Sequence, residues 1–295
     1  MPELPEVETI RRQLAPLVQG RKLERVRILD PRWSRPLAPA ELEDALTGRC
    51  VLALGRRGKY LVWECSGEVY LLQHLRMTGS VLHAPDPPPT HVRAWIELDR
   101  GGPLAIVDPR RFGTGELALG EQALESFFSA RLGLEPLDER FSAEYLRGLA
   151  GGRQTPVKAF LLDQRKLAGV GNIYADEALF RARIHPLREA GRLSLADWER
   201  VREAVVWALL AGIEARGATI DDFRHVDGVW GSFQDRFQVH RREGEPCPSC
   251  GRPIVKLRVA GRGTYVCERC QPRPRAFKRQ AAGRAGRFAP RSASR

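Results

Sequence analysis

"CPSCGRPIVKLRVAGRGTYVCERC", residues 247–270, holds four of the six cysteines of this 295-residue chain. Two residues separate Cys247 from Cys250 and Cys267 from Cys270, and sixteen residues lie between the two pairs. Such paired knuckles place four thiolates around one tetrahedral site, which favours one structural zinc ion, although a redox pair or two disulfides would use the same residues. Four protein ligands leave no open coordination position, so the metal would fold this ribbon rather than catalyse.

Between the knuckles, "VAGRGTYV" (259–266) predicts a β-hairpin with Arg262 at its tip between two glycines. A glycine-flanked arginine can approach a phosphate closely, but a solvated loop arginine fits the local sequence equally well. The remaining cysteines, Cys50 and Cys65, stand in strand-like segments and are expected to be ordinary buried thiols.

The other end of the chain, "MPELPEVE", has two interpretations. If Met1 is removed, Pro2 becomes a free secondary amine with a pKa of about 7.7–8.0, able to attack an electrophilic carbon with Glu3 as the neighbouring acid. Most Met-Pro starts have no such role. The simpler interpretation is a helix with Pro5 in its first turn and Gly20 at its C-terminus. Pro16 should kink this helix or end it there.

The charge is strongly positive and unevenly spread. The net charge is +12 and the pI is near 10.0, which indicates a polyanionic partner. Eight of those charges fall after Cys270, where the composition predicts a disordered basic tail. The longest apolar run is ten residues and the N-terminus is acidic, so we expect no membrane span, no secretory signal and a cytoplasmic location, where thiols stay reduced.

The two halves of the chain have different sequence patterns, and together these patterns predict an α+β fold. The first half contains short β-rich segments broken by glycine and proline, typical of an antiparallel sandwich or barrel, at 22–29, 50–65, 69–75, 91–98 and 103–108. Helical patterns follow at 142–150, 156–164, 172–182 and 195–217, the last with Gly217 as a C-cap. Residues 218–242 have a loop-like composition.

A set of motifs in a fixed order gives this sequence a family resemblance. The motifs are "MPELPEVET" (1–9), "RRGKYL" (56–61), "HLRMTGS" (74–80), "DPRRFG" (108–113), "LGLEPL" (132–137), "GVGNIYADEALF" (169–180) and the cysteine ribbon. From Pro2 to about Gln271 the chain resembles the formamidopyrimidine-DNA glycosylase and endonuclease VIII family, in its formamidopyrimidine branch.

The resemblance implies a domain plan. It consists of an N-terminal catalytic β-sandwich domain with an N-terminal helix (1–134), a helix-two-turns-helix DNA-binding domain with a lesion loop (135–237), a zinc finger (238–271) and a basic disordered tail (272–295).

The resemblance also implies an activity. The chain would be a bifunctional DNA glycosylase and apurinic/apyrimidinic lyase that removes oxidised purines (8-oxoguanine and formamidopyrimidines) in base excision repair, through a proline imine and β,δ-elimination. Its partner would be double-stranded DNA with oxidised bases, and we expect a bacterial monomer with one zinc ion, no organic cofactor and no membrane contact. The alternatives are an oxidised-pyrimidine glycosylase of the endonuclease VIII type and a noncatalytic protein that binds damaged DNA.

Residue roles follow from the resemblance in the same way. Pro2 would be the nucleophile, Glu3 the acid and Lys59 a phosphate contact that helps proton transfer, and Arg262 would bind phosphate and act in δ-elimination. The side chains that fill the gap left by an extruded base would be Met77, Arg110 and Phe112, which suits a thioether, an aromatic ring and an arginine. The remaining phosphate anchors would be His74, His91, Arg153 and Asn172.

Asn172 would open a helix whose free N–H groups face an anion, with Gly169 and Gly171 allowing close approach, although it could equally be a simple N-cap. The sequence departs from the family pattern in three places: Arg76 replaces a usual glycine, His240 and Arg241 replace a usual Tyr-Gly, and "DGVWGSFQ" (227–234) modifies the loop that covers the flipped base. Because these changes fall in DNA-facing regions, they bear on lesion preference more than on reaction type.

Overall fold

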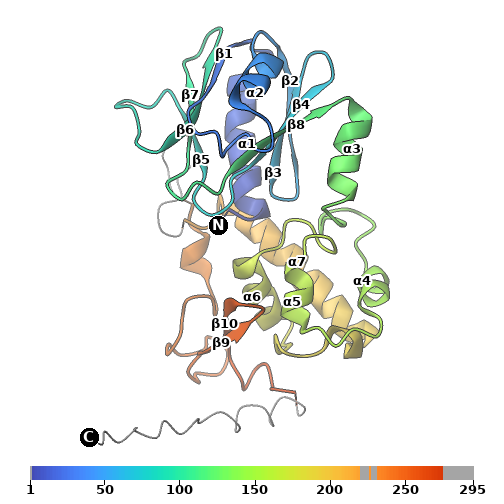
Figure 1. Ribbon diagram of the computed structural model, residues 1–295. Helices are drawn as coiled ribbons and strands as arrows, with labels where there is room; N and C mark the ends of the chain where they lie inside the picture. The colour runs from blue at the N-terminus through green and yellow to red at the C-terminus, as the bar shows by residue number, and fades with distance from the viewer. Residues whose placement is uncertain (1, 220–225, 227–230, 275–295) are drawn as a thin grey trace, which may run out of the picture.

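The computed structural model describes residues 2–219, 226 and 231–274, and it shows a β-rich half joined to a helical half that carries a small ribbon (Figure 1). Met1, most of the predicted lesion loop and residues 275–295 of the predicted tail lie outside the described residues. No helix among the described residues has the length and apolar character needed to cross a bilayer.

The N-terminal half is an antiparallel sandwich, as the sequence predicts. One sheet has the order β1-β6-β7-β5 and the other β2-β3-β4-β8. The strands are β1 (Leu23–Ile28), β2 (Val51–Arg57), β3 (Tyr60–Cys65), β4 (Val69–His74), β5 (Ser80–His83), β6 (Val92–Leu98), β7 (Leu104–Val107) and β8 (Thr114–Leu119). The five predicted β-rich segments contain six of these strands, because 50–65 holds both β2 and β3, while β5 and β8 lie outside the predicted segments.

Helix α1 (Leu4–Val18) belongs to the core of this sandwich, with Val7, Ile10 and Leu14 completely buried among residues of both sheets. Helix α1 does not end at Pro16, because it continues to Val18; a kink at Pro16 stays a prediction. A proline lacks the backbone N–H, so at this position the helix loses only one hydrogen bond, and the proline lies in the last turn, where the helix is about to end. Gly20 follows with a positive φ of 73°, as expected at a helix end.

The helical half has its own apolar core. It contains α4 (Ala143–Ala150), α5 (Val157–Leu162), α6 (Asn172–Arg181) and the long α7 (Leu195–Glu214), whose buried faces meet around Phe160 and Trp198. Short elements complete the chain: α2 (Pro39–Leu46), α3 (Glu121–Ser129), and the 3-10 turns η1 (Ala190–Arg192) and η2 (Phe233–Arg236).

The end of α7 differs by one residue from the prediction. The C-cap is Ala215, and Arg216 takes the left-handed conformation with a φ of 57°. The Gly217 N–H donates to the Gly212 carbonyl and the Arg216 N–H to that of Ile213, which is the Schellman pattern. Gly217 is also left-handed, with a φ of 78°, and a Cβ there would lie 2.8 Å from the Glu6 side chain.

The cysteine segment forms the predicted hairpin, with β9 (Val255–Val259) paired to β10 (Arg262–Val266). Its tip is Ala260–Gly261, so Arg262 is the first residue after the tip rather than the tip itself. Gln271 fixes the ribbon to the helical half, because its amide donates to the Ile184 carbonyl at 2.9 Å. The expectation of two further buried thiols is correct for Cys65 and wrong for Cys50, which is exposed where the chain enters β2.

Candidate active site and metal centre

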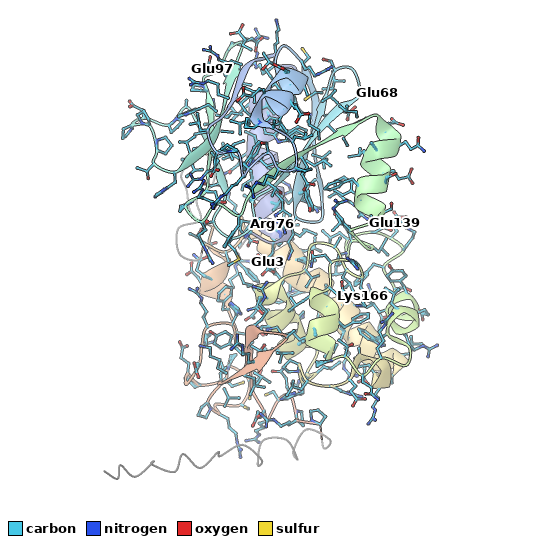
Figure 2. All side chains as sticks on the ribbon, in the orientation of Figure 1. Glu3, Glu68, Arg76, Glu97, Glu139 and Lys166 are labelled. Carbon is cyan, nitrogen blue, oxygen red and sulfur yellow. The ribbon has the colours of Figure 1, made fainter. Side chains whose placement is uncertain are left out.

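A cavity of 370 Å³ lies where the two halves and the ribbon meet. It gathers six of the predicted site residues: Glu3, Lys59, His74, Met77, Asn172 and Arg262. The three residues that depart from the family pattern, Arg76, His240 and Arg241, line it as well. Figure 2 shows Glu3 and Arg76 close to the junction between the halves. Pro2 is buried directly before Glu3.

The Glu3 carboxylate caps a helix from the other half of the chain. Its oxygens accept the backbone N–H groups of Ile173 at 3.0 Å and Tyr174 at 3.5 Å, at the N-terminus of α6. The N-cap of α6 is Gly171, so the interpretation of Asn172 as the N-cap is wrong. A Cβ at Gly171 would lie 2.2 Å from the Glu3 Cδ, which explains the glycine. The anion that this helix end faces is therefore a carboxylate of the same chain.

A second buried carboxylate supports the first. Glu6 accepts the Tyr174 hydroxyl and the Ala218 N–H, both at 2.7 Å, and the Glu3 N–H at 2.8 Å. Burial, together with the nearby charge of Glu3, raises the pKa of Glu6, and the hydrogen bonds only partly oppose this. Glu6 thus joins α1, α6 and the segment that follows α7.

Lys59 occupies the two-residue turn between β2 and β3 and is 5% exposed. Burial lowers the pKa of its amine, the charges of Glu3 and Glu6 oppose that effect, and Arg262 adds to it. Glu135 holds the turn: it accepts the Gly58 N–H and a bidentate pair of bonds from Arg56 at 2.8 and 2.9 Å. The lowered pKa favours the neutral amine that can accept a proton.

His74 ends strand β4 and its ring is fixed in one orientation. Its Nδ1 accepts the Arg76 N–H at 2.9 Å, and Tyr60 packs edge-on at 4.6 Å between ring centroids. Burial, with the charges of Arg76 and Lys59, lowers the pKa of His74 to about 3, so the imidazole is neutral and its Nε2–H is the group that can donate.

The helical half and the ribbon meet at a buried polar network. Lys158 is fully buried; its Nζ lies 2.7 Å from Asp176 and donates to the Gly263 carbonyl and the Thr264 hydroxyl. Asn172 donates to the same Gly263 carbonyl at 3.0 Å. These contacts anchor the strand that begins at Arg262 against α5 and α6. Burial lowers the pKa of Lys158, while Asp176 raises it.

His240 extends this network toward the cavity. Its Nδ1 lies 2.9 Å from Asp176, and Phe237 and Tyr265 pack edge-on against its ring. Glu177 fixes the backbone leading up to His240 by accepting the N–H groups of Gln238, Val239 and His240 at 2.8–3.0 Å. The replacement of a usual tyrosine is therefore accommodated by a specific carboxylate partner.

The three predicted gap-filling residues lie on two loops of the N-terminal half. Met77 lines the cavity, whereas Arg110 and Phe112 lie on the neighbouring loop and are exposed, Phe112 by 51%. The Arg110 guanidinium lies 5.0 Å from the centre of the Phe112 ring, within cation–π range. An exposed aromatic ring paired with an arginine suits insertion between bases.

Two predicted phosphate anchors do not line the cavity. His91 is exposed and lines a separate groove beside the proline-rich segment 85–89. Arg153 follows α4, is exposed, and donates to the Leu149 carbonyl at 2.8 Å. Their roles remain predictions.

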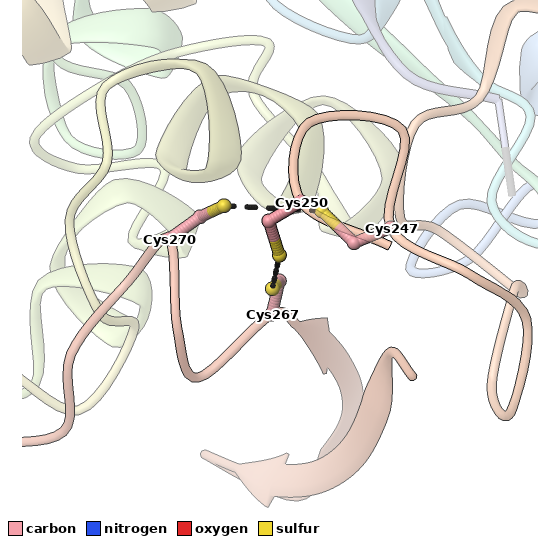
Figure 3. A group of neighbouring side chains, drawn as sticks. All are labelled: Cys247, Cys250, Cys267 and Cys270. Atoms are coloured by element: carbon pink, nitrogen blue, oxygen red, sulfur yellow. Dashed lines mark hydrogen bonds between the residues drawn. The ribbon is translucent and has the colours of Figure 1, made fainter. Parts of the chain in front are cut away.

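The four ribbon cysteines form the predicted cluster, with ligand sulfur atoms all within 4.8 Å of one another (Figure 3). Facing sulfur atoms are 3.9 Å apart for Cys247 and Cys270 and 3.4 Å apart for Cys250 and Cys267. A tetrahedral ion with bonds of about 2.3 Å requires sulfur atoms about 3.8 Å apart, so the site fits a zinc-sized ion. It is the only such group among the described residues.

Several residues of the site have no distinctive sequence signal. Glu6, Asp108, Glu135, Lys158 and Asp176 are buried or nearly buried charges. Acids and lysines are seldom buried without a partner, but sequence alone does not report burial. The available signal is membership of the family motifs: Glu6 lies in "MPELPEVET", Asp108 in "DPRRFG", Glu135 in "LGLEPL" and Asp176 in "GVGNIYADEALF", whereas Lys158 lies outside them.

Comparison with known families gives three matches along the chain. Residues 1–115 match the formamidopyrimidine-DNA glycosylase N-terminal domain, 132–224 the formamidopyrimidine-DNA glycosylase H2TH domain, and 244–273 a zinc finger found in FPG and IleRS.

Whole-chain relatives agree with these matches. Formamidopyrimidine-DNA glycosylases of Symbiobacterium thermophilum and Thermus thermophilus are 46% and 47% identical, covering 93% and 92% of this chain and 90% and 98% of theirs. The crystal structure of the MutM (FPG) protein from T. thermophilus has a TM-score of 0.83 at 44% identity, covering 92% of this chain and 98% of that one. A Lactococcus lactis FPG mutant in complex with Fapy-dG containing DNA has a TM-score of 0.86 at 35% identity, covering 92% and 100%.

Proposed function

The chain belongs to the formamidopyrimidine-DNA glycosylase family, and from this we propose that it excises oxidised purines from double-stranded DNA and then cleaves the strand as a lyase. The observation that carries the proposal is the cavity in which Glu3, Lys59 and Arg262 converge; Pro2 directly precedes Glu3 in the chain but is not among the residues that line the cavity. These residues come from segments that are far apart in sequence, and binding alone does not require an acid and a buried amine in one cavity.

The proposed first step is nucleophilic. The lone pair of the Pro2 nitrogen attacks C1′ of the damaged deoxynucleotide and the glycosidic bond breaks. The base leaves with the bonding electrons and takes up the proton that the Pro2 nitrogen loses. Glu3 gives a proton to the ring oxygen O4′, the sugar opens, and the Pro2 nitrogen becomes an iminium ion. The N–H groups of Ile173 and Tyr174 then stabilise the carboxylate that Glu3 has become.

The proposed second step is elimination. The iminium ion acidifies the C2′ proton, whose removal expels the 3′ phosphate; a second elimination then expels the 5′ phosphate, and water frees the enzyme. The burial that lowers the pKa of Lys59 supports a role in proton transfer here. Arg262, exposed on the ribbon hairpin at the cavity edge, is suited to hold a phosphate as it leaves.

Binding to DNA would use both halves and the ribbon. Neutral His74 offers one N–H donor to a phosphate, and Met77, Arg110 and Phe112 are assigned to the gap left by the extruded base. We assign catalysis to 1–134, duplex binding to 135–237 and the finger to 238–271. Cys247, Cys250, Cys267 and Cys270 would hold one Zn²⁺, which when bound folds the ribbon and so fixes Arg262.

Borohydride trapping tests the proposal directly. It reduces the iminium ion to a stable amine, so incubation with an 8-oxoguanine duplex should give a covalent protein–DNA adduct. Pro2→Gly should lose most base excision while keeping affinity for an abasic-analogue duplex. The absence of an adduct despite intact binding would favour the noncatalytic alternative, and an intact Met1 on fully active protein would refute the imine.

An oxidised-pyrimidine preference is the second candidate. One L. lactis FPG structure, with a TM-score of 0.85, is a complex with an oxidised pyrimidine containing DNA. Arg76, His240 and Arg241 also change the cavity lining of this chain. Parallel single-turnover reactions on 8-oxoguanine and oxidised-thymine duplexes decide between them, and faster excision of the thymine lesion would overturn our assignment.

A further inference from the structure

We propose that Asp108 is a positioning residue that joins two separate loops, 75–79 and 109–113, into one preformed wedge. The inference rests on the proposed function, because these loops carry the side chains assigned to enter the duplex. Asp108 itself touches neither base nor phosphate in this scheme. It is 1% exposed and lies directly after strand β7.

The Asp108 carboxylate organises the second loop from inside. Its Oδ2 accepts the N–H groups of Phe112 and Gly113, both at 2.7 Å, and its Oδ1 accepts the Arg110 N–H at 3.2 Å. A loop wound around one carboxylate in this way has its backbone donors satisfied without a regular element. A Cβ at Gly113 would lie 3.2 Å from Oδ2, so the glycine permits the close approach.

The same carboxylate holds the first loop through a single side chain. The Thr78 hydroxyl donates to Asp108 Oδ1 and accepts the Arg110 N–H at 3.3 Å. The first loop is itself a tight turn, since the Gly79 N–H donates to the Leu75 carbonyl at 3.0 Å. Thr78 is therefore the hydrogen-bonded link between two turns that are each internally closed.

The base of this unit is fixed to the sandwich. Arg93 of strand β6 donates to the Asp108 carbonyl at 2.8 Å, and the Asp108 N–H donates to the His91 carbonyl at 3.1 Å. Arg111, which has a φ of 60°, forms a bidentate pair with Asp30 at 2.6 and 2.9 Å. Movement of either loop would break several of these bonds together.

This arrangement has a consequence for duplex entry. Met77 enters from one loop and the Arg110–Phe112 pair from the other, so two independent loops would each lose conformational freedom on binding. If Asp108 and Thr78 hold the loops together, the loops already lose this conformational freedom when the protein folds. The side chains of both loops then enter the duplex as one unit. The effects of removing Met77 and Phe112 should then be coupled.

A matched pair of substitutions tests the link. Thr78→Val keeps the volume and removes the hydroxyl, leaving Asp108 its three backbone donors, and Thr78→Ser restores the hydroxyl. Thr114→Val is the control, because the Thr114 hydroxyl oxygen is buried and has no hydrogen-bond partner among the described residues. All three variants are compared with the wild-type protein as the full chain.

The first measurement needs no DNA. Amide hydrogen exchange of residues 109–113 in the free protein should accelerate at least about twofold in Thr78→Val and remain as in wild type in Thr78→Ser and Thr114→Val. Unchanged exchange in Thr78→Val would overturn the proposal whatever the enzymatic activity, so its failure is distinct from a negative borohydride trap.

The second measurement is a double-mutant cycle of Met77→Ala and Phe112→Ala, using affinity for an abasic-analogue duplex. In the wild-type and Thr114→Val backgrounds, the fold-loss of affinity of the double variant should be smaller, by a factor of at least about two, than the product of the fold-losses of the two single variants. In the Thr78→Val background the losses should simply multiply. A coupling factor that survives Thr78→Val would show that the loops are not joined through Asp108.

Discussion

The carboxylate of Glu3 accepts the backbone N–H of Ile173 at 3.0 Å, joining the third residue of the chain to the first turn of helix α6. The contact links the sandwich half to the helical half at the cavity itself. A negative charge at a helix N-terminus is stabilised by the unpaired N–H groups and the helix dipole. The acid assigned to sugar-ring opening is thus held by the half assigned to duplex binding.

Gly171→Ala should displace Glu3, because the new Cβ would lie 2.2 Å from the Glu3 Cδ. A catalytic group misplaced by about 1 Å costs up to about 100-fold in rate, so we expect a loss of that order in single-turnover base excision with nearly unchanged DNA affinity. Gly148→Ala in α4 is the control, since no atom lies within 4 Å of its Cβ position. Wild-type excision by Gly171→Ala would contradict the assigned role of Glu3.

Glu135→Gln should loosen the turn that carries Lys59, because the amide cannot accept both the Gly58 N–H and the bidentate Arg56 bonds as well as a carboxylate does. We expect strand cleavage to slow by about tenfold or more and base release to change less, since Lys59 is assigned to elimination.

Separate quantification of released base and cut strand measures this difference. Glu139→Gln is the matched control: Glu139 is exposed, four residues further along the same connection (Figure 2). If Glu135→Gln slowed base release and strand cleavage equally, displacement of Lys59 would not explain the effect of the substitution.

Removal of the metal should unfold the ribbon and weaken DNA binding. The folding of such four-cysteine modules depends on about 10–16 kcal/mol of metal binding, and Arg262 and Gly263 lie in the hairpin between the ligand pairs. Metal analysis should find one zinc per chain, and a strong chelator should lower affinity for a lesion duplex until zinc is returned. Full affinity in metal-free protein would show that the ribbon folds without an ion.

Stability should fall as the pH is lowered below about 6.5, because two buried histidines are neutral in the folded state. Burial lowers the pKa of His185 to about 4 and that of His74 to about 3, while the unfolded chain binds protons near 6.5. Both lowered values make the unfolded state bind more protons between pH 6.5 and 4, so each histidine removes about 1.4 kcal/mol of unfolding free energy per pH unit.

Urea unfolding at pH 7, 6 and 5 measures this slope. In the wild-type protein His185 Nδ1 accepts the Leu187 N–H, and the side-chain oxygen of an asparagine can replace this acceptor. His185→Asn should therefore reduce the dependence of the unfolding free energy on pH. An unchanged slope in His185→Asn would show that this residue is not part of the pH dependence.

Much of the fold follows from local patterns. The hairpin at 50–65, helix α7 and the four-cysteine cluster were all predictable, because alternation, helical periodicity and ligand spacing are properties of neighbouring residues. The exceptions have tertiary causes that a local sequence pattern does not contain. Strands β5 and β8 form because partner strands are available. The left-handed backbone after α7 begins at Arg216, one residue before Gly217, and the missing side chain of Gly217 leaves room for Glu6.

The sequence by itself determined the reactive groups of this protein and their family: a proline at position 2 followed by an acid, a lysine after "RRG", and two cysteine pairs. Only the tertiary structure decided what those groups contact. It placed Glu3 on helix α6, closed the Lys59 turn with Glu135 and tied two loops together through Asp108. These contacts join residues 30 to 170 positions apart in the sequence. A buried charged group requires a hydrogen-bond or charge partner, and the fold decides which distant residues become buried next to each other. No short segment of the sequence contains that information.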